Sequence, residues 1–184
     1  MAQRQKTIAR AVEIRGYGTH TGAPARAVIR PSDADTGFIF NVGSVSIPAR
    51  AEYVADTTNA VTLAKGGRRV MTVEHVLSAL CGMSIHNAQI DVDGPELPAT
   101  DGSARPIVDA ILEAGVKTLG APIRTLRVPH PVWLRDEGRH IVVLPANDFL
   151  VTYTLDRPDG SAETFHTPVR RPAYATKVSP ARTF

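Results

Sequence analysis

The alternation of apolar and polar residues is most regular between Met71 and Met83, where it predicts a helix. Apolar side chains there follow the i, i+3, i+4, i+7, i+8 spacing of one helical face: Val73, Val76, Leu77, Leu80 and Cys81. At 3.6 residues per turn these positions form one stripe. Glu74 falls on the edge of the stripe and His75 almost opposite it, so His75 is expected to face away from the core that the helix covers.

Glu74 and His75 lie in the first turn of this helix, where unpaired backbone N–H groups create a positive end. That end favours an ionised carboxylate and disfavours an imidazolium. An anionic glutamate beside a neutral histidine suits a general base next to a metal ligand. A favourable acid with a solvated histidine is the simpler interpretation, because an adjacent Glu-His pair is less specific than the two-histidine helical zinc motif.

Shorter alternating segments on both sides of this helix predict strands. They cover residues 6–15, 25–31, 37–42, 44–49, 53–58, 60–63 and 87–92. A second helix is predicted to begin after Ser103, with Pro106 in its first turn, and to end at Gly115. Its apolar face is expected to consist of Ile107, Val108, Ile111 and Leu112. Two helices facing a mostly antiparallel sheet predict a two-layer α+β domain over residues 1–122.

The remaining residues, 123–184, read as strands only. The predicted strands are 125–128, 132–135, 139–144, 149–155 and 163–167, with turns at 136–138 and 158–160. With no helix to cover it, such a sheet would expose a large apolar patch. We therefore expect either an incomplete second domain or a partner that covers the sheet.

Composition indicates an ordinary globular protein without marked affinity for nucleic acid. The 184 residues are 43% hydrophobic and carry a formal net charge of +3, without a run of basic residues. A phosphorylated small molecule is therefore a better candidate ligand than nucleic acid. The single cysteine, Cys81, suits a reducing cytoplasm, and neither a secretory signal nor a membrane span is recognisable.

Two polar loops are candidates for function. The glycine-rich turn at residues 16–22 could form the wall of a polar pocket around His20, although a simple tight loop is favoured. The connector at residues 93–104 carries three acids, Asp93, Glu96 and Asp101. They could bind a cation, but they lack the spacing of a calcium loop, so turn formation is the better interpretation.

Three segments occur together and in order: GTHTG at 18–22, TVEHVLSAL at 72–80 and GPELPATDGSARP at 94–106. They closely resemble the zinc-dependent UDP-3-O-acyl-N-acetylglucosamine deacetylases of lipid A biosynthesis, and the resemblance extends to the terminal ARTF. It implies two similar domains, each like the second domain of ribosomal protein S5. This chain would be the N-terminal portion, with one complete domain and an incomplete second domain of the same type at residues 123–184.

The resemblance also implies roles for individual residues. In that family the histidine of TVEH is one of three protein ligands of zinc and the preceding glutamate is the general base, which would be His75 and Glu74 here. Water activated by zinc and Glu74 would attack the N-acetyl amide of the UDP-sugar and release acetate. Thr183 would place a hydroxyl at the oxyanion, and His20 and Phe184 would contact the substrate.

The sequence also departs from the family pattern. The two other zinc ligands of the family, in an HxxxD helix, and its general-acid histidine follow ARTF, and this sequence contains no HxxxD. Ala60 stands in place of the cysteine of the family's DTxxC segment. Besides the N-terminal portion of a deacetylase, the alternatives are a non-catalytic remnant, a sugar-nucleotide-binding module, or one half of a split enzyme whose partner chain supplies HxxxD.

Overall fold

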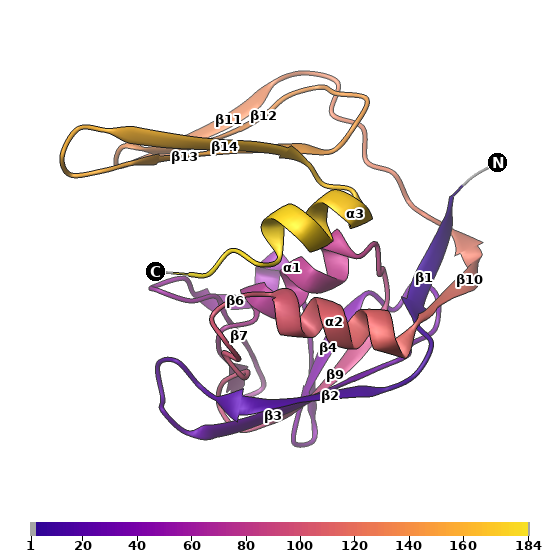
Figure 1. The fold of residues 1–184 in the computed structure, drawn as a ribbon. Coiled ribbons are helices and arrows are strands. Elements are labelled where there is room, and N and C mark those ends of the chain that lie inside the picture. Colours follow the sequence, from indigo (N-terminus) through magenta and orange to yellow (C-terminus); the bar gives the residue numbers. More distant parts are fainter. Residues whose placement is uncertain (1–2, 184) are drawn as a thin grey trace.

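The centre of the structure is a five-stranded sheet with two helices packed on one face (Figure 1). The computed structural model describes residues 3–183, and the strand order is β2-β3-β9-β4-β5. These strands are β2 (Val12–Tyr17), β3 (Pro24–Arg30), β4 (Phe38–Val42), β5 (Val45–Pro48) and β9 (Ala88–Asp93). All neighbours are antiparallel except β4 and β9. The predicted mostly antiparallel sheet is confirmed.

The two predicted helices are present as α1 (Glu74–Gly82) and α2 (Arg105–Ala114). Between them and the sheet lies a core whose largest fully buried side chains include Phe40, Ile90, Leu80, Ile107 and Ile111. One member of each predicted apolar face is wrong. Cys81 is exposed, and Leu112 is 47% exposed. Ala79 and Ala114 are buried instead, because each lies a turn or less away on the side that meets the sheet.

Two smaller sheets flank this core. A short helix, η1 (Ala51–Tyr53), precedes a three-stranded sheet of β6 (Val54–Asp56), β7 (Thr62–Lys65) and β8 (Arg68–Val70), and β1 (Arg4–Ile8) pairs with β10 (Val116–Pro122). The single strand predicted at 6–15 is wrong, because β1 leaves the main sheet to pair with β10. The strand predicted at 125–128 is also wrong: the chain is extended one segment earlier, where β1 supplies a partner.

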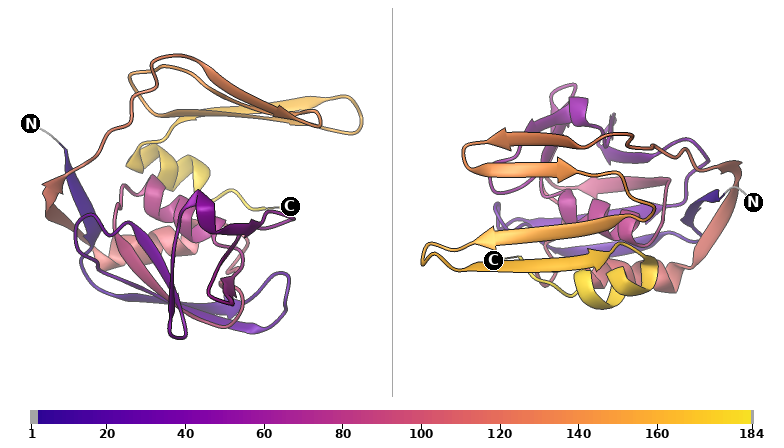
Figure 2. Two further views of the ribbon diagram at one scale, coloured as in Figure 1. Left: turned by 180° about the vertical axis from the view of Figure 1, so that it is seen from behind. Right: turned by 90° about the horizontal axis from the view of Figure 1, so that it is seen from above.

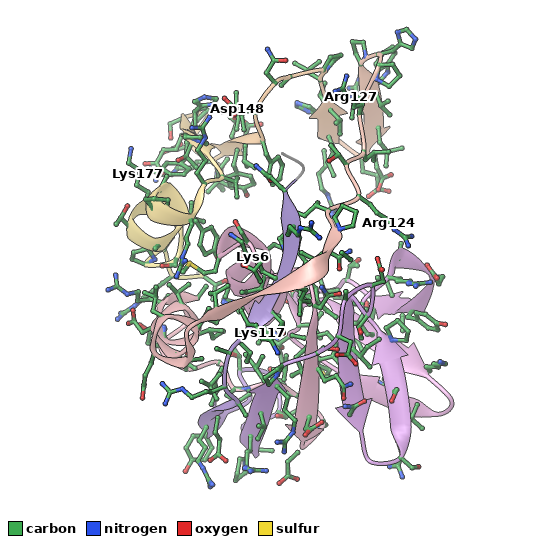
Figure 3. All side chains as sticks on the ribbon, turned by 90° about the vertical axis from the view of Figure 1, so that its right-hand side faces the viewer. Lys6, Lys117, Arg124, Arg127, Asp148 and Lys177 are labelled. Atoms are coloured by element: carbon green, nitrogen blue, oxygen red, sulfur yellow. The ribbon has the colours of Figure 1, made fainter. Side chains whose placement is uncertain are left out.

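Beyond β10 the chain runs to two hairpins. Figure 3 shows this connecting segment, with Arg124 and Arg127, leading away from the β1–β10 pair, where Lys6 and Lys117 lie. The hairpins are β11 (Val132–Asp136) with β12 (Arg139–Val143), and β13 (Leu150–Asp156) with β14 (Ala162–Pro168). Both predicted turns are confirmed. The two hairpins are separate two-stranded sheets, which lie on the far side of the helices from the main sheet (Figure 2).

The chain then turns back in a helical segment, α3 (Arg171–Ala173) continued by η2 (Tyr174–Val178). The prediction that residues 123–184 form strands only is therefore wrong. The buried ring of Tyr174 packs against Gly82 of α1, where a Cβ would lie 2.3 Å from the ring, and its hydroxyl is 2.7 Å from Ser78 Oγ. A side chain of any size at position 82 would push this segment away from α1.

The structure contains many strands and few helices, which confirms the coarse prediction of a mixed fold of helices and strands. The division of the chain into domains at residue 122 and the likeness to the ribosomal protein S5 domain stay predictions. Among residues 3–183, no helix is long and apolar enough to cross a membrane.

Candidate active site

The start of α1 carries the two residues that the sequence singled out. Glu74 and His75 are half-buried, and both lie in the first turn. The Glu74 Oε2 atom accepts a hydrogen bond of 3.0 Å from the backbone N–H of Val61, just before β7. This bond orients the carboxylate. It could not be predicted from the sequence, because Val61 is thirteen residues away and contributes only its backbone.

The glycine-rich turn is a tight loop, as favoured from the sequence. The Gly18 N–H donates to the Ala23 carbonyl at 2.9 Å, and the Gly22 N–H donates to the Gly18 carbonyl at 3.0 Å. Gly18 is buried, and a Cβ there would lie 2.2 Å from Glu96 Oε2, so only glycine fits. The turn leaves His20 exposed at its tip.

Glu96 joins this turn to the start of α1. Its side chain is completely buried, and its Oε2 accepts from the Thr21 N–H at 2.9 Å and the Thr21 hydroxyl at 2.8 Å. Its Oε1 accepts from the Thr72 hydroxyl at 2.8 Å, and the His20 N–H lies 3.1 and 3.2 Å from the two oxygens. Glu96 is thus an internal anchor, and the interpretation of this residue as a turn former is wrong.

The electrostatics of Glu96 follow from these contacts. Burial raises the pKa of the Glu96 carboxyl, but the backbone N–H groups of Thr21 and His20 and the hydroxyls of Thr21 and Thr72 lower it by more. The net pKa lies below the usual glutamate value, so the carboxylate is ionised at neutral pH. The sequence signal that could have found it is a glutamate between Pro95 and Leu97, in an otherwise apolar segment.

The same connector receives the end of the chain. The Thr183 N–H donates to the Gly102 carbonyl at 2.9 Å, and the backbone of Arg182 pairs with that of Ser103 in an isolated antiparallel β-bridge. Asp101, as predicted, forms a turn: its Oδ1 accepts from the N–H and hydroxyl of Ser103. Thr183 is exposed, and Phe184 lies outside the described residues.

The connector therefore gathers three of the predicted segments. Through Glu96 it holds the turn with His20 and the helix start with Glu74 and His75, and through Gly102 it holds the segment with Thr183. A surface depression lies elsewhere, beside β2 and β3: it has a volume of about 620 Å³ and is lined by Arg15, Gly16, Tyr17, Pro24, Ala25, Arg26 and Asp93.

The residues present do not fit a complete catalytic zinc site. Within residues 3–183, no three His, Cys, Asp or Glu side chains lie close enough together to hold a metal ion. Catalytic zinc is generally held by three protein ligands. His75 would provide one of them, and the described part of the chain does not complete a set of three around it.

Comparison with known proteins identifies the family. The model of the family described as UDP-3-O-acyl N-acetylglycosamine deacetylase matches residues 5–184. The chain is 43% identical over 185 residues to the UDP-3-O-acyl-N-acetylglucosamine deacetylase of Anaeromyxobacter dehalogenans (strain 2CP-C), covering 98% of this chain and 60% of that protein. It is 38% identical over 186 residues to the enzyme of the same name from Myxococcus xanthus (strain DK1622), with 98% and 59% covered.

A third relative gives the same result. The deacetylase of Legionella pneumophila (strain Paris) is 36% identical over 193 residues, which cover 98% of this chain and 62% of that protein. The chain thus spans about 60% of the length of the curated relatives that it matches. Because the match runs through almost the whole chain, the chain belongs to the UDP-3-O-acyl N-acetylglycosamine deacetylase family.

Proposed function

We propose that this chain supplies the base-carrying part of an enzyme that removes the N-acetyl group of UDP-3-O-acyl-N-acetylglucosamine in lipid A synthesis. The observation that carries the proposal is the Glu74 carboxylate, fixed by the Val61 N–H beside His75 at the start of α1. Membership of the deacetylase family supports the substrate and the reaction.

In this reaction Glu74 acts as the general base. Its Oε2 is held by Val61, and its Oε1 takes the proton of the water that attacks the amide carbon. The C–N bond then breaks as the nitrogen takes up a proton, either the one held by Glu74 or one from the general-acid histidine that the family carries after ARTF. Acetate leaves and the amine stays on the sugar. The Thr183 hydroxyl faces the oxyanion, and His20 and Phe184 contact the substrate.

His75 is the one zinc ligand that we assign to this chain. Its imidazole lies in the first turn of α1, and an imidazole binds a metal in its neutral form. We place the remaining two ligands outside these 184 residues, either in the part of the relatives' length that the chain does not span or on a partner chain.

The hairpins fit the proposal that residues 1–122 are one domain and residues 123–184 the beginning of a second. Large apolar side chains are exposed on both hairpins, among them Trp133, Leu134, Phe149 and Phe165. Side chains of this kind are covered in a complete domain. We therefore expect the 184-residue chain to bind a hydrophobic dye, and a dye-negative monomer would contradict this division.

Paired variants of the complete enzyme test the catalytic assignment. Glu74→Gln keeps an oxygen for the Val61 N–H but accepts no proton, so kcat should fall by roughly 10²- to 10⁴-fold while zinc stays bound. His75→Ala should lower the zinc content itself. Glu113→Gln, on the exposed end of α2, is the matched control and should change neither quantity.

The outcomes separate the competing functions. Loss of zinc in Glu74→Gln, or full activity, would refute the base assignment. If the 184-residue chain binds the UDP-sugar tightly and the complete protein shows no turnover with zinc added, a binding module replaces the enzyme as the better explanation.

A further inference from the structure

The Glu96 carboxylate joins segments that are far apart in sequence. Its donors come from His20 and Thr21 on one side, 76 and 75 residues away, and from Thr72 on the other, 24 residues away. The carboxylate is completely buried and the Thr72 side chain nearly so. Burying a carboxylate carries a desolvation cost, which is offset when its oxygens accept hydrogen bonds. Here both oxygens of Glu96 accept hydrogen bonds.

Among the described residues, no hydrogen bond links the turn itself directly to α1. Its internal backbone bonds, from Gly18 to Ala23 and from Gly22 to Gly18, close the turn on itself, and the Ala99 N–H donates to the Tyr17 carbonyl at its base. Within residues 3–183, the hydrogen bonds that connect the tip of the turn to Thr72, just before α1, run through the Glu96 carboxylate.

The residue on the helix side is itself under conformational constraint. Thr72 has φ of 60°, a left-handed conformation that is unfavourable for a β-branched residue. The neighbouring backbone fixes it in place, because Met71 donates to the Pro95 carbonyl at 3.1 Å and accepts from the Leu97 N–H at 3.1 Å. The hydroxyl of Thr72 is thereby aimed at the carboxylate of the residue between Pro95 and Leu97.

We propose that Glu96 is the positioning residue of this site: its carboxylate holds His20, on the glycine-rich turn, at a fixed place relative to Glu74 and His75 on α1. The proposal rests on the proposed function for the meaning of that placement, but the clamp itself is a property of the chain without substrate. Glu96 touches no reacting atom in this assignment and acts through the two segments that it joins.

Nuclear magnetic resonance of the 184-residue chain tests the clamp directly. In Glu96→Gln the amide NH₂ would face the donors of Thr21 or Thr72, so the His20 and Thr21 amide protons should lose their carboxylate partner. We expect these two amides to shift upfield and to exchange with solvent at least tenfold faster. Amides of β3 and β9 should keep their exchange rates.

A matched control separates the loss of the clamp from the loss of any well-bonded carboxylate. Asp159 also accepts from a backbone N–H and a hydroxyl, both of Ser161, but on the exposed turn of the β13–β14 hairpin. Asp159→Asn should leave the exchange of His20 and Thr21 within twofold of the parent value. Unchanged exchange at these amides in a folded Glu96→Gln variant would overturn the proposal.

A second variant decides the matter if Glu96→Gln does not fold. Thr72→Val removes only the hydroxyl donor and keeps the shape of the side chain at its unusual φ. The His20 amide should exchange about threefold faster or more. Unchanged exchange at this amide would refute the clamp. If Glu74→Gln kept full activity or lost zinc, the proposed function would be refuted, but the exchange measurements on the Glu96 and Thr72 variants would be unaffected.

Discussion

The five-stranded sheet and the two hairpins are built from the same kinds of residues, yet they meet opposite environments. Phe40 on β4 is completely buried, whereas Phe149, next to β13, is 69% exposed. Leu80 on α1 is completely buried, and Leu134 on β11 is 69% exposed. The difference is that the sheet has two helices on one face, whereas the apolar side chains of the hairpins have no packed layer over them. Alternation therefore predicts a strand, but burial also needs a second layer.

The largest effect expected from this comparison is on the free energy of unfolding of two phenylalanine variants. Phe40→Ala removes a completely buried ring from the core and should cost about 3–5 kcal/mol. Phe149→Ala removes a mostly exposed ring and should change stability by less than about 0.5 kcal/mol. Urea denaturation followed by circular dichroism measures both.

Equal destabilisation by the two variants would contradict the comparison. If Phe149→Ala cost as much as Phe40→Ala, the hairpins would be packed in solution, either by a second copy of the chain or by a rearrangement against α1. Sedimentation at several protein concentrations distinguishes those two explanations, because only the first depends on concentration.

The comparison also shows which parts of the fold could be predicted. The strands at 25–31, 37–42 and 87–92 and both long helices follow from periodicity, because each has one face on the core. The strand β10 could not be predicted, since its partner β1 is more than a hundred residues away and its own side chains alternate weakly. The α3–η2 helix does not follow from periodicity, because Pro172 at its start and a contact with Gly82 of α1 determine it more than an apolar stripe does.

The site shows the same limit. The Glu74–His75 pair is visible in the sequence because neighbours in the chain form it, whereas the Glu96 anchor depends on donors from two distant segments. An acidic residue in a polar connector normally indicates a turn, and Asp101 forms one here. Only the three-dimensional structure shows that position 96 is completely buried while position 101 is exposed.

A smaller effect concerns the contact between α1 and η2. Gly82→Ala would place a Cβ 2.3 Å from the Tyr174 ring, so η2 should move away from α1 at a cost of about 1–3 kcal/mol. Gly120→Ala on β10 is the matched control: a Cβ there has no neighbour within 4 Å, and stability should change by less than about 0.5 kcal/mol.

Limited proteolysis shows where the Gly82→Ala effect arises. Cleavage after Lys177 should accelerate in this variant, because η2 is released, while the segments of the main sheet stay protected. Equal cleavage rates in the parent and in both glycine variants would mean that η2 is not held by its contact with α1.

The smallest expected effect compares one ion pair on the sheet with one on a hairpin. Arg30 Nε lies 2.5 Å from Asp91 Oδ2 across β3 and β9, and Arg157 Nη2 lies 2.6 Å from Glu163 Oε1 on the second hairpin. Asp91→Asn should cost about 0.2–1 kcal/mol in the main unfolding transition, the usual range for exposed pairs. Glu163→Gln should cost less, because the hairpin shares little packing with the core that unfolds in that transition.

The contribution of the Arg30–Asp91 ion pair to stability should depend on pH. Burial raises the pKa of the Asp91 carboxyl, but hydrogen bonds from Arg30 and Asn41 and the charges of Arg30 and Arg26 lower it by more. Since the folded-state pKa lies below the ordinary value of 3.8, the contribution is present above that pH and is lost as the pH falls through the folded pKa. The difference between the parent and Asp91→Asn should therefore vanish in acid, and it should shrink in 1 M salt. A difference that persisted at pH 2 would show that the Asn substitution acts through packing on the sheet and not through the charge of Asp91.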